Sequence, residues 1–351
     1  MMTQPKDISI GSITGLLKPK YVLISAMLGE DFIPTQGVDV FIDLNTLITN
    51  LSGYQKYLNG LPFSKNIEID IISNLLMTIK HWKDYMKNHD GSRVFIIYND
   101  FEMLPLIEAD MIKSYLIPHI NKYQQDRYKQ FVYYFQEALK KIKTICKHLP
   151  AIYLIACKKF DSFVVPNILD TYESRYRVVI SGNPLMTNYN YMNNSKVLFT
   201  RYRRQGPYQI SDPIHIIQSM TSNHEDIMEV FSRNKVLYNT LQLILGDYDR
   251  GILGLSAQIG ITPFTTKLLR AIEQKDIPTD TKSIESVMKV FDNEYHEYIR
   301  KNYSLVDIES HTKMIPQSEI EKIKSEMNDK IFDIDALRSI TVDGLNLMEL
   351  L

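Results

Sequence analysis

The chain has 351 residues, a formal net charge of -1 at pH 7 and a hydrophobic content of 44%. This length and apolar content are sufficient for one large domain, or two small ones, with a buried core. The near-neutral charge excludes a protein that holds nucleic acid through a global excess of basic residues. Any such binding must therefore use local basic patches.

The cysteine content and the hydropathy of the chain indicate which cellular compartment to expect. The two cysteines, Cys146 and Cys157, lie in apolar segments and are too few for a disulfide framework, which predicts core thiols in a reducing compartment. No apolar run approaches the ~20 residues that cross a bilayer, and the first residues lack the pattern of a signal peptide. We therefore expect a cytoplasmic protein without a membrane partner, or, for a viral protein, one in the host cytoplasm or the virion.

Strands and helices alternate in the first half of the chain, after a polar leader that we place at residues 1–37. Apolar runs predict strands near residues 38–43, 92–100, 151–157 and 176–182. Helical periodicity predicts helices near residues 67–87 and 120–149, and a short one near 162–172 that Pro166 breaks. Such alternation is typical of an α/β fold with a mainly parallel sheet and helices on both faces.

Polar residues follow or adjoin the predicted strand ends, where such sheets bind ligands. We expect four of them to share one cleft at that edge of the sheet: Asp43, Asp161, Asn183 and Asp247. Asp100 falls at the end of the second predicted strand and is a further candidate.

Beyond residue 190 the pattern becomes mainly helical. Residues 196–210 predict a hairpin that carries Lys196, Arg201, Arg203 and Arg204 among aromatic residues. Helices are predicted near 212–221 and 234–245, and another begins near Thr262 or Pro263. We interpret residues 38–190 as an α/β core and 191–351 as a helical part, packed together as one compact unit.

Short motifs in this order resemble those of the 5' nuclease superfamily, which includes flap endonucleases, 5'-3' exonucleases and phage-type ribonuclease H. They are "FIDLN" at 41–45, "FDSFV" at 160–164, "SGNPLM" at 181–186 and "GDYDRG" at 246–251, followed by the glycine-rich "GLSAQIGIT" at 254–262. The resemblance implies a PIN-like fold and a helix-turn-helix variant (H3TH-like) that grips a DNA phosphate. It also implies a carboxylate cluster that holds two or three divalent metals.

Most of the family's metal-binding carboxylates are absent from the matching positions. Asp43, Asp161 and Asp247 are retained, while Asp100 and Asp249 stand close to expected positions. The remaining positions of the pattern hold Tyr98, Phe163, Val164, Asn183, Leu185 and Arg250. Hard cations need several charged oxygen ligands, so we expect no cofactor, or Mg²⁺ or Mn²⁺ if the protein is active. The retained aspartates are either helix caps and turn residues or residual metal ligands.

The features that bind nucleic acid in this family are better preserved. Lys122, Arg127 and Lys129 match the basic helical arch, and the hairpin arginines 201, 203 and 204 are suited to phosphates or bases. Gly254, Gly260 and Lys267 belong to the glycine-rich turn and the helix after it, where backbone amides bind phosphate. Alternative interpretations are a solvated helix face, a hairpin packed on the core and a plain helix hairpin.

Three hypotheses for function follow. The first is a non-catalytic nuclease-like protein that binds branched or single-stranded DNA or assembles with other proteins. The second is an active Mg²⁺-dependent 5'-3' exonuclease or flap endonuclease that uses the five candidate aspartates. The third is a structural or interaction subunit that does not touch nucleic acid. The sequence contains no HExxH, CxxC, GxSxG or Walker-type motif that would indicate other chemistry.

Overall fold

The computed structural model describes residues 37–44, 67–85, 91–99, 122–157, 161–169, 176–181, 184–192, 195–203, 206–211, 234–247, 252–253, 255, 267–268, 270–328 and 330–340. The predicted leader (1–37), apart from its last residue, and the predicted helix at 212–221 lie outside these ranges.

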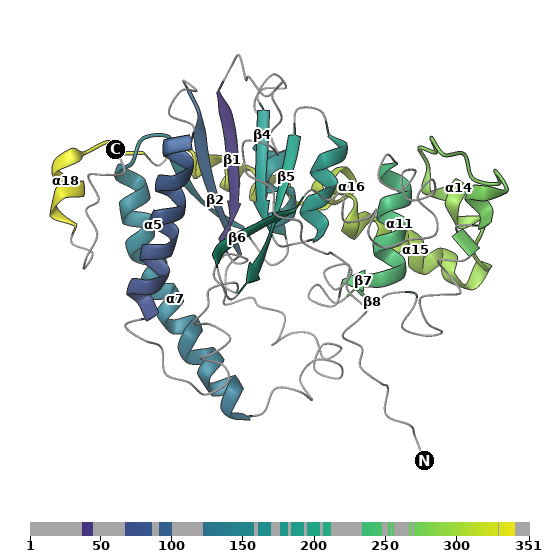
Figure 1. The fold of residues 1–351 in the computed structure, drawn as a ribbon, viewed down its shortest axis with the longest axis horizontal. Coiled ribbons are helices and arrows are strands. Elements are labelled where there is room, and N and C mark those ends of the chain that lie inside the picture. The colour runs from purple at the N-terminus through teal and green to yellow at the C-terminus, as the bar shows by residue number, and fades with distance from the viewer. Residues whose placement is uncertain are drawn as a thin grey trace.

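A six-stranded sheet runs through the α/β part (Figure 1). Its strands are β1 (Val38–Asp43), β2 (Arg93–Asn99), β3 (Ile152–Cys157), β4 (Tyr176–Ser181), β5 (Ser195–Arg203) and β6 (Gly206–Ser211). They lie in the order β3-β2-β1-β4-β5-β6; the first five are mutually parallel, and β6 is antiparallel to β5. The predicted mainly parallel sheet is confirmed. The predicted hairpin is also present, but it is not separate, because β5 pairs with β4 and extends the sheet.

The chain reverses its direction of travel across the sheet between β1 and β4. It first moves outward from β1 to β2 and β3, and then returns to place β4 on the other side of β1. In open α/β sheets this switch point is where the carboxyl ends of adjacent strands leave a crevice for ligands. The last residues of β1 and β4 are therefore the first place to look for a site.

Helices cover both faces of the sheet. On one face, α5 (Ile67–Tyr85) and α7 (Lys122–His148) lie side by side (Figure 1) and pack on Val40 and Ile42. The other face, which includes Phe41, is covered by the following elements. They are η4 (Asp161–Val164), α8 (Val165–Ile168), η5 (Pro184–Tyr191), α16 (Ile308–Met314) and α17 (Gln317–Ser325). Because successive strand residues point to opposite faces, the run Val40-Phe41-Ile42 must be apolar throughout to fill both layers.

The third predicted helix differs in one detail. Pro166 does not break it but stands in the first turn of α8, directly after the 3₁₀ turn η4. This position suits proline, because the first amides of a helix have no partner within the helix.

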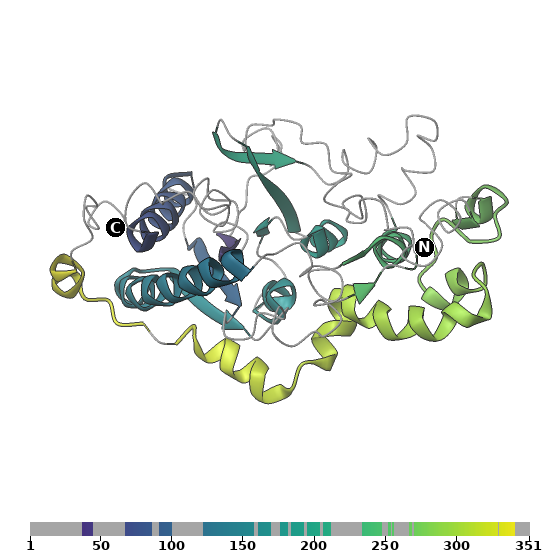
Figure 2. The same ribbon diagram turned by 90° about the horizontal axis from the view of Figure 1, so that it is seen from below.

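Most of the remaining helical elements pack on one another. They are α11 (Lys235–Leu245), α14 (Ile284–Met288), the 3₁₀ turn η7 (Asn293–Tyr295) and α15 (His296–Val306). Helix α18 (Ile334–Ser339) instead contributes Leu337 to the core beneath α5 and α7. Residues 267–268 and 270–273 are helical, within the helix predicted to begin near Thr262. In Figure 2 the yellow-green helices α15 to α17 follow one another along one side of the molecule, and α18 lies beyond them against α7. A helical C-terminal part is thus confirmed.

The two cysteines are buried free thiols, as predicted. Burial raises the pKa of the Cys146 thiol to about 12, so this group stays protonated and unreactive at neutral pH. Within the described ranges, no helix has the length and apolar content needed to span a bilayer.

Candidate site at the carboxyl edge of the sheet

Asp43 and Ser181 meet at the switch point. Asp43 is the last residue of β1 and Ser181 the last residue of β4, and the register Ile42↔Ile180 makes them neighbours. The Ser181 hydroxyl donates a 2.6 Å hydrogen bond to Oδ2 of Asp43, and both residues are buried. A buried carboxylate requires such donors, because removing it from water without partners is costly.

The ends of β2 and β3 carry no carboxylate within the described residues at 93–99 and 152–157. Tyr98, at the position of the family's second aspartate, is half-buried and packs against the cluster beneath α5 and α7. Its carbonyl accepts a hydrogen bond from the thiol of Cys157, the last residue of β3, at 3.2 Å. Among the described residues, the ends of these two strands are therefore joined by packing and by this contact.

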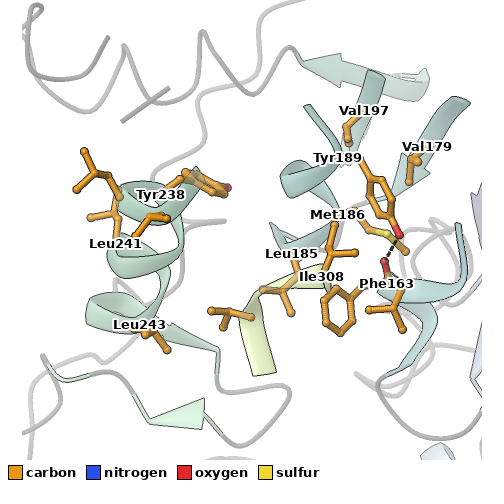
Figure 3. Close-up of a cluster of buried hydrophobic side chains, with 14 of the residues drawn as sticks. Phe163, Val179, Leu185, Met186, Tyr189, Val197, Tyr238, Leu241, Leu243 and Ile308 are labelled. Atoms are coloured by element: carbon orange, nitrogen blue, oxygen red, sulfur yellow. Dashed lines mark hydrogen bonds between the residues drawn. The ribbon is translucent and has the colours of Figure 1, made fainter. Parts of the chain in front are cut away.

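Phe163, Val164 and Leu185 stand where the family pattern expects carboxylates, and each has at most 1% of its surface exposed. They belong to the core beneath α16 and α17, together with Met186 and Tyr189 (Figure 3). The Tyr189 hydroxyl donates to the Phe163 carbonyl at 2.8 Å. These three side chains therefore point into packed apolar surroundings rather than into a solvated cleft.

His311 of α16 closes this packing from outside the sheet. Its ring lies 4.9 Å from the Phe163 ring, centroid to centroid. The neighbouring Thr312 accepts a hydrogen bond from Asn167 of α8 at 3.0 Å. Helix α16, from the C-terminal part, thus contacts both η4 and α8.

A buried polar network joins η5 and α11 to the junction between α15 and α16 beside this core. Asn188 donates to the Val306 carbonyl at 3.1 Å, and Asn239 donates to Oδ1 of Asp307 at 3.2 Å. Thr187 and Tyr238 share a hydrogen bond. Burial raises the pKa of Tyr238 to about 12, so its hydroxyl remains neutral. Segment η5 is consequently held to α11 and α15 by buried polar contacts.

The structure places the remaining metal candidates as follows. Asp161 opens η4 after β3, and Asp247 ends the two-residue strand β7 (Gly246–Asp247), which pairs with β8 (Ile252–Leu253) next to α11. For both, only the backbone is described. Asp100, Asn183, Asp249 and Arg250 lie outside the described residues. Within the described part of the chain, no group of three or more His, Cys, Asp or Glu side chains could hold a metal ion.

The nucleic-acid candidates are distributed over α7, the β5–β6 hairpin and the C-terminal helices. Arg127 is half-buried on α7, and Lys267 forms a surface ion pair with Asp292 at 2.8 Å. In the hairpin, Arg201 pairs with Gln209 and Arg203 with Gly206, with a shift in register between them. Only the backbone is described for Lys122, Lys129, Arg201 and Arg203, while Arg204, Gly254 and Gly260 lie outside the described residues.

Two features of the surface and the edge were not anticipated from the sequence. Ser181 begins the motif "SGNPLM", and its position near the end of the strand predicted at 176–182 could have identified it. Tyr133 and Tyr134 are exposed on α7. The spacing of the apolar residues around them could have predicted this for Tyr133, since it places that residue opposite the buried stripe.

Comparisons with known proteins complete the description. No protein-family model matches the chain, and no curated protein matches it. A solved structure of the bacteriophage T5 flap endonuclease, described as a pseudo-enzyme–product complex with DNA and metal ions, is 16% identical over 83% of this chain and 98% of that chain, with a TM-score of 0.46. The T5 5'-exonuclease with bound zinc is 16% identical over the same shares, with a TM-score of 0.48.

Proposed function

We propose that the chain is a non-catalytic, nucleic-acid-binding protein with a nuclease-like fold, in which packed side chains replace the metal site. The observation that carries this proposal is the burial of Phe163, Val164 and Leu185, which stand where the nuclease pattern requires carboxylates. Hydrolysis by two metals needs enough negative charge to hold both cations around a phosphate. Apolar side chains in a closed core supply neither this charge nor space for hydrated ions.

The described side chains at the switch point do not suit a divalent metal. Asp43 brings a carboxylate, but one of its oxygens already accepts the Ser181 hydrogen bond. A single engaged carboxylate is a poor site for Mg²⁺ or Mn²⁺, which take six oxygen ligands at close to octahedral geometry. We therefore assign no hydrolytic step to this chain.

Local positive charge supports the binding part of the proposal. Helix α7 contains seven Lys and Arg residues and two acidic ones, a net +5 in a chain whose total is -1. The hairpin adds Arg201, Arg203 and Arg204. Positive side chains of this kind bind the phosphates of DNA and make the affinity salt-dependent. We propose single-stranded or branched DNA as the partner, bound with modest affinity because the total charge is near zero.

A cleavage assay tests the catalytic part. We expect wild-type protein and Asp43→Ala to be indistinguishable on a 5'-flap substrate and on an RNA–DNA duplex, with millimolar Mg²⁺ or Mn²⁺. If wild type cleaves and Asp43→Ala does not, the protein is an active exonuclease or flap endonuclease. In that case Asp100 and Asp249 would have to supply the missing charge.

Fluorescence anisotropy at low salt, with single-stranded and flapped duplex DNA, tests the binding part. We expect detectable binding at micromolar protein. If no DNA binds, the protein has a structural or assembly role with protein partners instead.

A further inference from the structure

Helix α7 separates into a buried stripe and an exposed face. Phe131, Phe135, Ala138, Ile142 and Ile145 recur at helical spacing, and all are at most 1% exposed beneath α5 and the sheet. Adjacent residues of a helix are about 100° apart. Tyr133, two positions after Phe131, is therefore turned away from the core, while Tyr134, three positions after it, lies at the edge of the buried stripe and is partly exposed.

This exposed face carries two neighbouring aromatic rings. Tyr133 is 60% exposed and Tyr134 is 38% exposed. The ring centroids are 5.7 Å apart and the planes meet at 70°, in an edge-to-face arrangement. Edge-to-face rings do not cover each other as stacked rings do. Flat aromatic surface is thus available on the outside of the helix.

Charged side chains continue along the same face. Lys140 lies two turns after Tyr133 and forms an exposed ion pair with Glu137 at 2.6 Å. Lys141 reaches Glu68 of α5 at 2.6 Å. The Lys140–Glu137 pair is exposed, and ion pairs of this kind are weak, so Lys140 can exchange its carboxylate for a phosphate. The net charge of the helix is +5, which favours a polyanionic partner over a basic peptide.

We propose that Tyr133 and Tyr134 form a stacking site for the bases of single-stranded nucleic acid on the outer face of α7. This inference rests on the proposed function and adds the form of nucleic acid that the helix prefers. Unpaired bases expose faces on which tyrosine stacks, whereas the bases of a duplex are stacked on one another. Aromatic rings beside Lys side chains are the combination that binds single strands without regard to sequence.

An abasic strand separates stacking from charge, because it keeps the phosphates and lacks the bases. The probes are oligothymidylate of about 12 nucleotides, within the roughly 4–16 that single-strand sites cover, and the abasic strand of equal length. We expect wild type to bind the thymidylate about tenfold or more tightly than the abasic strand. In Tyr133→Ala/Tyr134→Ala this preference should fall to within about twofold, while affinity for the abasic strand stays unchanged.

Two controls accompany the measurement. Tyr133→Phe/Tyr134→Phe keeps both rings and should keep the preference for bases. Met314→Ala removes a side chain of similar exposure, 56%, on α16 and should change neither affinity. Thermal melts check that each variant is folded, which we expect because the substituted side chains are on the surface.

The outcomes distinguish this inference from the proposed function. If wild type binds both strands equally well, the stacking site is wrong while nucleic-acid binding stands. If the alanine pair retains the preference for bases, stacking occurs elsewhere and this assignment is also wrong. If wild type binds neither strand, the proposed function fails and the stacking site fails with it.

Discussion

The Ser181 hydroxyl lies 2.6 Å from Oδ2 of Asp43, and this hydrogen bond joins the last residues of β4 and β1 across the switch point of the sheet. In α/β proteins, this crevice is where a ligand usually binds. Here the described side chains satisfy one another instead. The bond links residues 138 positions apart in the chain, so the edge contributes to the stability of the fold.

Replacement of Ser181 by Ala should measure this contribution. The change removes a donor from a buried carboxylate, and a hydrogen bond to a charged group contributes about 1.5–3 kcal/mol. We expect the free energy of unfolding, measured with urea, to fall by about that amount. Ser325→Ala is the control, because this exposed hydroxyl bonds only to a carbonyl of its own helix, that of Lys322, at 2.7 Å. Equal effects of the two substitutions would show that the Asp43–Ser181 bond is not special.

Restoring a carboxylate at Phe163 should unfold the protein rather than rebuild a metal site. Phe163 is fully buried and packs against His311. Phe163→Asp combines a cavity with a buried charge and should cost more than about 4 kcal/mol, whereas Phe163→Leu should cost about 1–2 kcal/mol. Thermal and urea unfolding provide the comparison. If Phe163→Asp is as stable as Phe163→Leu, the side chain reaches solvent and the position still belongs to an open cleft.

Local patterns predict much of this fold because the strands are buried on both faces and so carry unbroken apolar runs. The strand predicted at 38–43 has those bounds, and the helix predicted at 67–87 ends at Tyr85. The pairing of β5 with β4 could not be predicted, because a basic hairpin has the same sequence pattern whether it is free or added to a sheet. The same limit applies to the site. The sequence places Asp43 at a strand end, but the hydrogen bond from Ser181 depends on which strands become neighbours.

The buried polar network predicts a pH dependence of stability centred on Asp307. Burial opposes ionisation of this carboxyl, but the hydrogen bond and charge of Lys235, together with hydrogen bonds from Ser310, outweigh it and lower the pKa. The ionised group therefore stabilises the folded chain above its unfolded pKa of about 4, and this contribution is lost as the pH falls through the lower folded-state pKa.

Asp307→Asn tests this dependence. Asn preserves the cap of α16 but removes the charge that pairs with Lys235 at 2.9 Å. We expect wild type to exceed the variant in free energy of unfolding by about 1–3 kcal/mol at neutral pH. The difference should shrink toward zero in acid. Glu309→Gln is the control, since Glu309 contacts the same lysine at 3.2 Å but is 61% exposed. A difference that is constant from neutral pH to acid would mean that the charge of Asp307 contributes nothing.

The hairpin arginines should govern the salt dependence of DNA binding. Each phosphate contact releases counterions, so the logarithm of the affinity falls linearly with the logarithm of salt, with a slope of about -0.7 per contact for single strands. Replacing Arg203 and Arg204 by Glu removes two potential contacts and adds two repulsive charges. We expect weaker binding to single-stranded and flapped DNA, and a salt slope shallower by at least about 1.4. Anisotropy titrations across a series of salt concentrations measure both quantities. Lys267→Glu is the comparison: it reverses a single charge outside the hairpin, so it should change the slope less than the double substitution does. If the arginine variant weakens binding without changing the slope, the arginines act by packing the hairpin rather than by contacting phosphates.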